Sequence, residues 1–203
     1  MSTTASPAIA LSLSAIADSD LVVRAIRGRE DGFEELVRRY QRPIAAYVYR
    51  MVGDYDAALD LTQEVFIKVY GSLSRYRPEY KFSTWIYKIA HNAAVDHLRR
   101  YCTREQSLTS EADGAPYELP IESSKPTPEQ ESERRERRAE IESVVDQLSP
   151  AYRELVVLRH SHDLSYDEIA EVMGLPLGTV KNRLFRAREV MRQQFLQRGI
   201  TSV

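Results

Sequence analysis

The sequence predicts an all-α fold of two small helical domains joined by a flexible acidic linker. Apolar residues recur at the spacing of about 3.6 residues that helices require, on both sides of residues 103–125, and no strand-like alternation occurs. Residues 103–125 themselves lack this period and are rich in Ser, Glu and Pro. A stretch of this length and composition is typical of a linker between domains rather than of a loop within one.

We therefore expect four segments along the chain. They are a disordered tail over residues 1–17, an N-terminal helical domain over 18–101, the linker over 102–133 and a C-terminal domain over 134–203. The first 17 residues hold an apolar stretch but no charged side chain. Since a signal peptide has a basic residue before its apolar core, a tail is the preferred interpretation.

The overall composition is that of a soluble globular protein, with 43% hydrophobic and 29% charged residues among 203. No run reaches the roughly 18 apolar residues of a membrane span, so we expect no membrane insertion. Cys102 is the only cysteine, which excludes an intrachain disulfide and suits a cytoplasmic location.

The net charge is −2, but the charges are segregated along the chain. Residues 75–104 contain seven Lys or Arg against two Asp or Glu, and residues 174–198 contain six against one. Residues 105–133 between them contain one against eight. Because local charge decides contact with phosphates, the two basic blocks are candidates for nucleic-acid binding.

The N-terminal domain begins with two predicted helices. The segment Asp18–Ser19–Asp20 offers a cap for a short first helix. A second helix covers residues 33–51, and Pro43 inside it is expected to cause a kink or a break. Gly53 ends this helix, and Asp54 can cap the next one.

Two further helices complete the N-terminal domain, separated by a polar connection rich in Tyr. The third helix has an apolar stripe formed by Ala58, Leu61, Val65 and Val69. The fourth runs from about residue 83 to 100, and its apolar side chains are Trp85, Ile86, Ile89, Ala90, Ala93 and Leu98. A lone Trp between apolar neighbours is usually part of a core, which is the interpretation we prefer for Trp85.

Capping signals define the helices of the C-terminal domain. The sequence Thr-Pro-Glu-Gln at 127–130 indicates a capped helix start, and Ser-Pro at 149–150 repeats the cap-plus-proline signal. The segment 165–168, Ser-Tyr-Asp-Glu, is a capping box that starts a short helix. Gly174 then allows the left-handed backbone that ends this helix, and Pro176 prevents its continuation.

The last helix forms a helix-turn-helix with the short helix before it. Its buried stripe is predicted to consist of Val180, Leu184, Ala187 and Met191. The opposite face can reach base edges in the major groove of DNA and carries Asn182, Phe185, Arg186 and Glu189, with Thr179 near it. The flanks of this helix carry the cations Lys181, Arg183, Arg188 and Arg192, whose charge suits contact with DNA phosphates. A solvated basic helix is the simpler alternative, but the outward Phe185 and the excess of cations favour DNA binding.

Motifs in both domains resemble those of bacterial sigma factors of the extracytoplasmic function (ECF) group. The segment LSYDEIAEVMGLPLGTVKNRLFRARE resembles their promoter-reading region, while DLTQEVFIKVY and FSTWIYKIAHNAAVDHLRR resemble their second region. The resemblance covers residues 19–100 and 134–197. It implies a subunit of RNA polymerase whose N-terminal domain docks on the clamp helices of the largest subunit and opens the −10 element. The C-terminal domain is then expected to read the −35 element as duplex.

The third helix of the N-terminal domain is the segment to which the resemblance assigns polymerase binding. Once its stripe turns inward, Ile67 is left exposed among polar residues, and such a residue suits contact with a partner helix. The candidate polymerase-binding residues are Asp60, Gln63, Glu64, Phe66, Ile67 and Lys68. Phe66 is equally compatible with the core, and an amphipathic core helix is the simpler alternative for the segment.

Residues 75–100 mix cations with aromatic side chains, a combination that holds single-stranded DNA. Binding of an unstacked base offsets the cost of unstacking, so strands can open without ATP. The resemblance assigns the flipped −10 base to the loop before the STW-type helix and to the helix itself. The candidates are Tyr76, Lys81, Phe82, Ser83, Tyr87, Lys88, Asn92, Arg99 and Arg100.

No motif points to catalysis or to a cofactor, so an enzyme is the least supported class. His160 and His162 lie near Asp163, but without further ligands a polar helix end is preferred to a metal site. The resemblance implies core RNA polymerase, promoter DNA and an anti-sigma factor as partners. Two alternatives stay open: a non-sigma helix-turn-helix transcription regulator with an N-terminal sensor or dimerisation module, and a protein-interaction module that binds an acidic partner.

Overall fold

The computed structural model describes residues 13–105 and 128–199, which form helices joined by turns, without a strand among them. These residues fall into two compact units, one on each side of the stretch 106–127. The all-α class and the two helical domains are thereby confirmed. The middle of the acidic linker lies outside the described residues, but both of its predicted ends are helical, because one helix continues to Glu105 and the next begins at Pro128.

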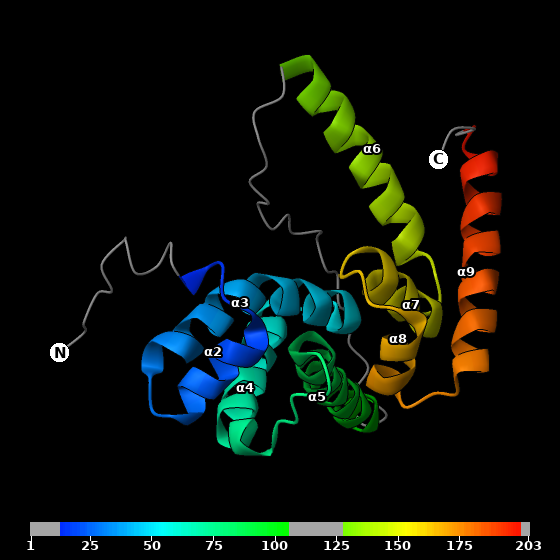
Figure 1. The fold of residues 1–203 in the computed structure, drawn as a ribbon. Coiled ribbons are helices and arrows are strands. Elements are labelled where there is room, and N and C mark those ends of the chain that lie inside the picture. The colour runs from blue at the N-terminus through cyan, green and yellow to red at the C-terminus, as the bar shows by residue number, and fades with distance from the viewer. Residues whose placement is uncertain (1–12, 106–127, 200–203) are drawn as a thin grey trace. The chain divides into compact units, whose positions relative to one another are not determined.

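The first unit contains α2 (Asp18–Ile26), α3 (Glu30–Val52), α4 (Tyr55–Ser72), the short 3-10 helix η1 (Leu73–Arg75) and α5 (Phe82–Glu105). The helix α3 packs against α2, α4 and α5 (Figure 1). Its inner face contributes Ile44, Tyr47 and Val48, all fully buried. The stripe predicted for α4 is buried as well, together with Thr62 and Phe66. The core of this unit therefore lies around α3.

The ends of α3 and α4 follow the sequence signals. Gly53 ends α3 with a φ of 75°, and Asp54 caps α4 because its Oδ1 accepts a 2.7 Å hydrogen bond from the Ala57 amide. The helix α3 runs through Pro43 without a break, although proline lacks the amide that a helix interior uses. The predicted break does not occur, because tight packing of the next residue, Ile44, stabilises the helix at this point.

Residues 13–17, which were predicted to belong to the tail, pack on α3. Leu13 is buried, and its carbonyl oxygen accepts a 2.9 Å hydrogen bond from the Arg39 guanidinium. The same guanidinium forms ion pairs with Asp18 at 2.6 Å and with Glu35 at 2.9 Å. Arg39 therefore connects residues 13–17 and the start of α2 to α3, and residues 13–17 belong to the packed unit and not to a free tail.

Glu35 is a charged residue in a buried position, with only 4% of its surface exposed. Arg38 donates to both oxygens of its carboxylate, at 2.7 and 2.6 Å. These hydrogen bonds hold the pKa of Glu35 below its ordinary value, against the opposite effect of burial. The carboxylate is therefore ionised at neutral pH, and its pairing with arginines makes its burial tolerable.

The second unit contains α6 (Pro128–Asp146), α7 (Pro150–His160), α8 (Tyr166–Met173) and α9 (Leu177–Gln197). The helix α9 packs against the other three (Figure 1). Pro150 begins α7 as predicted, although Ser149 makes no side-chain cap hydrogen bond. Leu148 lies in the core, whereas Ile141 of α6 is exposed. Within the described parts of the chain, no helix is long and apolar enough to cross a membrane.

We expect Gly32→Ala to destabilise the first unit. Gly32 lies in α3 where α2 approaches it, and a Cβ at this position would be 2.6 Å from the Leu21 carbonyl oxygen and 2.9 Å from the Arg24 Cβ. Overpacking of this kind costs about 1–3 kcal/mol, which chemical denaturation measures as a lower midpoint. Gly71→Ala in α4 is the control, because a Cβ there meets nothing within 4 Å. Equal stabilities of the two variants would contradict the close approach of α2 and α3.

Candidate functional site

The helices α8 and α9 form the helix-turn-helix that the sequence predicts. Ser165 Oγ accepts a 3.2 Å hydrogen bond from the Glu168 amide, and the Glu168 carboxylate accepts a 2.7 Å bond from the Ser165 amide. This completes the predicted capping box. Gly174 ends α8 in the left-handed conformation with a φ of 64°, and α9 begins directly after Pro176. Local sequence chemistry therefore sets both the length of the turn and the start of α9.

The helix α9 has one buried and one exposed face. Three members of the predicted stripe are at most 1% exposed, namely Val180, Leu184 and Ala187. The fourth member, Met191, is half-buried. On the opposite face Phe185 is 71% exposed, and its neighbours Asn182 and Arg186 are exposed as well. Since Phe185 contributes little to the core, the residues of this face are available to a binding partner.

The cations of α9 differ in whether they are already engaged. Arg188 donates to the Tyr166 hydroxyl at 3.1 Å, and Arg192 pairs with Glu189 at 2.7 Å. Three others make no polar side-chain contact with any residue that the structure describes: Lys181, Arg183 and Arg186. These three can bind an anionic partner without first breaking a contact, which distinguishes them from Arg192 on the same helix.

A small basic cluster lies where α7, α8 and α9 meet. The Arg159 guanidinium is 5.5 Å from the centre of the Tyr166 ring, whose hydroxyl accepts the hydrogen bond from Arg188. Burial, together with the charges of Arg188 and Arg159, lowers the pKa of His160 below its ordinary value. His160 is therefore neutral at pH 7, and the positive potential of this cluster comes from the two arginines.

The outer face of α4 carries most of the residues expected to bind a polymerase. Ile67 is 71% exposed, and beside it Glu64 pairs with Lys68 at 2.7 Å. Asp60 and Gln63 are exposed as well. Phe66 is 9% exposed and belongs to the core, the alternative that the sequence left open for it.

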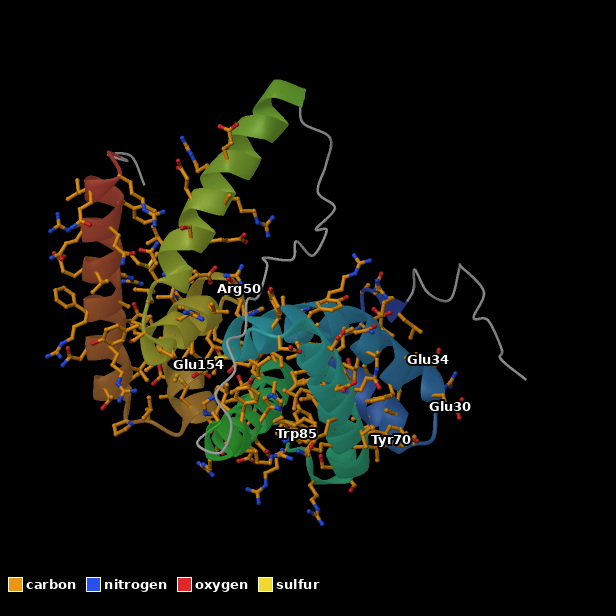
Figure 2. All side chains as sticks on the ribbon, turned by 180° about the vertical axis from the view of Figure 1, so that it is seen from behind. Glu30, Glu34, Arg50, Tyr70, Trp85 and Glu154 are labelled. Carbon is orange, nitrogen blue, oxygen red and sulfur yellow. The ribbon has the colours of Figure 1, made fainter. Side chains whose placement is uncertain are left out.

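Tyr70 extends this face, although no sequence pattern singled it out. It lies about one turn after Ile67, is 61% exposed and packs edge-on against Phe33, whose ring centre is 4.9 Å away. Figure 2 shows Tyr70 near the part of α3 that carries Glu30 and Glu34. The spacing of three residues from Ile67 was the signal that could have identified it.

A pocket between α4 and α5 adjoins the outer face of α4. Its charged lining consists of Asp60 and Glu64 from α4 with His97 and Arg100 from α5. The hydrogen bond from Lys68 lowers the pKa of Glu64 most, and the charges of Arg100 and His97 act in the same direction. The pocket therefore brings candidate polymerase-binding carboxylates next to Arg100, a candidate for DNA binding.

The candidates for single-stranded DNA separate into buried and exposed residues. Tyr76, Phe82 and Tyr87 are 9%, 2% and 3% exposed, so their rings are largely part of the core and not a surface for bases. The other candidates are exposed or half-buried, namely Lys81, Ser83, Lys88, Asn92, Arg99 and Arg100. Burial of the three aromatic rings argues against direct base contact, because rings near cations occur in cores as well as in strand-binding sites, and the role of the other candidates stays a prediction.

The loop 77–81 keeps an exposed surface along its whole length. Tyr80 in this loop is 49% exposed. Trp85 is half-buried rather than enclosed, with its ring centre 5.3 Å from that of Tyr76 and 5.8 Å from that of Phe82. The accessible aromatic groups of this region are therefore Tyr80, which lies in the loop that the resemblance assigned to the −10 base, and Trp85, which was expected in the core.

Comparisons with known proteins agree with the two units. Residues 36–102 match the model of Sigma-70 region 2, and residues 138–191 match that of Sigma-70, region 4. The RNA polymerase sigma-H factor of Pseudomonas aeruginosa is 38% identical over 86% of this chain and 91% of its own length. The ECF RNA polymerase sigma factor SigW of Bacillus subtilis is 34% identical over 83% of this chain and 91% of its own length.

A solved structure shares the fold. The sigma factor RpoE of Bartonella quintana, in complex with the anti-sigma factor NepR, matches with a TM-score of 0.65 at 19% identity. The match covers 81% of this chain and 96% of that chain.

Two neighbouring residues of α9 are expected to differ sharply in their effect on stability. Leu184→Ala should destabilise the second unit by about 2–5 kcal/mol, because it removes a fully buried side chain. Phe185→Ala should change stability by no more than about 0.5 kcal/mol, because the ring lies on the exposed face. Urea denaturation followed by circular dichroism measures both, and a loss from Phe185→Ala as large as that from Leu184→Ala would contradict the orientation of α9.

Proposed function

Because the chain belongs to the extracytoplasmic function (ECF) group of the sigma-70 family, we propose that its two units divide promoter recognition between them. The protein is a sigma factor, which binds core RNA polymerase and directs promoter recognition, DNA melting and transcription initiation. The first unit binds the polymerase and the −10 element, and the second reads the −35 element. A non-sigma regulator is not favoured, because the region 2 match covers residues 36–102, outside the helix-turn-helix.

The observation that carries the assignment of the second unit is the exposed face of α9. Arg186 has the donors to bind guanine bidentately, Asn182 can bind adenine, and Phe185 can contact the thymine methyl group. Lys181 and Arg183 on the flanks suit phosphates, and neither has a polar partner among the described residues. Arg188 and Thr179 are proposed as further contacts of the same helix with the duplex.

The −10 element is assigned to the exposed parts of the first unit. The loop 77–81 offers Lys81 and an accessible ring at Tyr80, and α5 adds Asn92, Arg99 and Arg100. Cations along the backbone with an aromatic surface for bases are the combination that retains an unpaired strand. The buried Tyr76, Phe82 and Tyr87 support this surface from below and are not proposed as base contacts.

Polymerase binding is assigned to the outer face of α4. An exposed apolar side chain at Ile67, flanked by Gln63 and the Glu64–Lys68 ion pair, suits a partner helix of mixed polarity. A face of this kind, polar at the rim and apolar at the centre, is typical of protein interfaces. The clamp helices of the largest polymerase subunit are the proposed partner.

Three further properties follow from the proposal. The protein acts as a regulatory subunit and has no catalytic activity of its own. It works in the cytoplasm, where the polymerase and the chromosome are. An anti-sigma factor is proposed as a partner, since the related fold of RpoE is bound to the anti-sigma factor NepR.

Arg186→Ala and Lys181→Ala are expected to affect DNA binding differently. Loss of Arg186 should lower affinity for the preferred −35 sequence by about 1–3 kcal/mol and reduce discrimination at one base pair. Loss of Lys181 should weaken binding to all sequences alike and reduce the slope of log K against log salt by about one. Fluorescence anisotropy with −35 duplex variants at several salt concentrations measures both effects.

Arg192→Ala is the matched control for these two variants, because Arg192 is an arginine of the same helix that already pairs with Glu189. It should change neither the sequence preference nor the salt slope appreciably. The assignment of roles is wrong if all three variants weaken every duplex to the same extent.

Reconstituted transcription tests the function as a whole. The purified protein added to core RNA polymerase should produce specific transcripts from supercoiled genomic promoter templates, and the core alone should not. Sequencing of the transcript starts then gives the promoter elements. Absence of any specific transcript from a complete genomic library would overturn the assignment as a promoter-directing subunit.

The same assay separates the α4 face from the rest of the surface. Ile67→Ala should raise the concentration of protein needed for half-maximal transcription, because it removes an exposed apolar contact without cost to the core. Ile26→Ala is the matched control, since Ile26 is an isoleucine of α2 that is also exposed. Equal effects of both variants would argue against α4 as the polymerase-binding face.

A further inference from the structure

The loop 77–81, which lies between η1 and α5, is held in place by one buried tyrosine. The Tyr76 hydroxyl donates a 2.6 Å hydrogen bond across the loop to the carbonyl oxygen of Tyr80. Among the backbone groups, the Tyr80 amide donates to the Arg77 carbonyl oxygen at 3.1 Å, and the Trp85 amide of α5 donates to the Lys81 carbonyl oxygen at 3.2 Å. Tyr76 therefore joins the start of the loop to its far end.

The rest of the loop has little packing of its own to determine its shape. Each residue from Arg77 to Lys81 is exposed, so burial of the loop side chains contributes little to fixing the backbone. Pro78 restricts one φ angle, but the closure of the loop depends on its hydrogen bonds. Without the Tyr76 hydroxyl, the Tyr80 carbonyl would bind water, and more than one loop conformation would become accessible.

The ring that carries this hydroxyl is itself firmly fixed. Tyr76 packs against Phe82 and Trp85, with ring centres 5.9 and 5.3 Å away. On its other side Phe82 packs edge-on against Tyr40 at 5.2 Å. Burial, and to a smaller degree the charges of Asp18 and Glu79, raise the pKa of Tyr76, so its hydroxyl remains a proton donor at physiological pH.

We propose that Tyr76 is a positioning residue, whose hydroxyl holds the loop 77–81 in the one conformation that discriminates between bases of the unpaired −10 strand. The inference rests on the proposed function, in which this loop receives a −10 base. It assigns to Tyr76 a role that does not require contact with DNA. The base contacts themselves come from the exposed part of the loop, and the buried hydroxyl determines where they lie.

Tyr40 provides a matched control within the same unit. Its ring also packs on Phe82, and its hydroxyl also donates a part-buried hydrogen bond, but to Asp18 at the start of α2 and not to the loop. Tyr76→Phe and Tyr40→Phe therefore each remove one hydrogen-bonded hydroxyl and keep the ring. Only the first of them releases the loop.

The experiment uses holoenzyme reconstituted from core polymerase and each full-length variant. The probes are forked DNAs with a duplex −35 element and an unpaired −10 strand, with each of the four bases placed in turn at each unpaired position. Competition binding gives the ratio of affinities for the best and the worst base. A −35 duplex without the unpaired strand reports on the second unit, and thermal unfolding reports on stability.

Tyr76→Phe should reduce the ratio of affinities by about fivefold, the size expected from one net hydrogen bond, with −35 binding unchanged. Tyr40→Phe should lower the unfolding temperature and leave the ratio unchanged. The inference fails if Tyr76→Phe retains the full ratio, or if both variants reduce it in proportion to their loss of stability. If the wild-type holoenzyme shows no base preference in the unpaired strand, the assignment of the −10 element to this loop fails as well.

Discussion

The packing of aromatic rings around Phe82 is the constraint on which the first unit depends. Phe82 is 2% exposed and contacts the rings of Tyr40, Tyr76 and Trp85, with centres 5.2, 5.9 and 5.8 Å away. These rings come from α3, from the end of η1 and from α5, so one side chain fixes the first residue of α5 relative to α3. Since each aromatic pair contributes about 0.5–1.5 kcal/mol beyond its buried area, the cluster also determines where the exposed loop before α5 begins and ends.

Local signals in the sequence predicted the helices and their ends well. The capping box at Ser165, the left-handed Gly53 and Gly174, and the cap at Asp54 all occur as expected, because each acts through neighbouring backbone groups. The break at Pro43 does not occur, since tertiary packing outweighs a local preference. The anchoring of residues 13–17 was not predictable either, because it depends on an arginine more than twenty residues further along the chain.

The candidate site was predictable in its location but not in its individual members. Composition identifies a segment rich in rings and cations, yet it does not distinguish a buried ring such as Tyr87 from an accessible one such as Tyr80. The same holds for charge: Lys181 and Arg192 count equally in a sum over the sequence, but only the second already has a carboxylate partner. Side-chain neighbours decide both cases, and a single sequence does not contain them.

The two faces of α9 also bear on how such a protein can evolve. Residues that hold the second unit together, such as Leu184, alternate along the helix with residues that the core does not use, such as Phe185. Substitutions on the outer face therefore cost little stability. With the DNA contacts proposed for this face, a duplicated copy of the gene could acquire a new sequence preference while the buried face still holds the unit together.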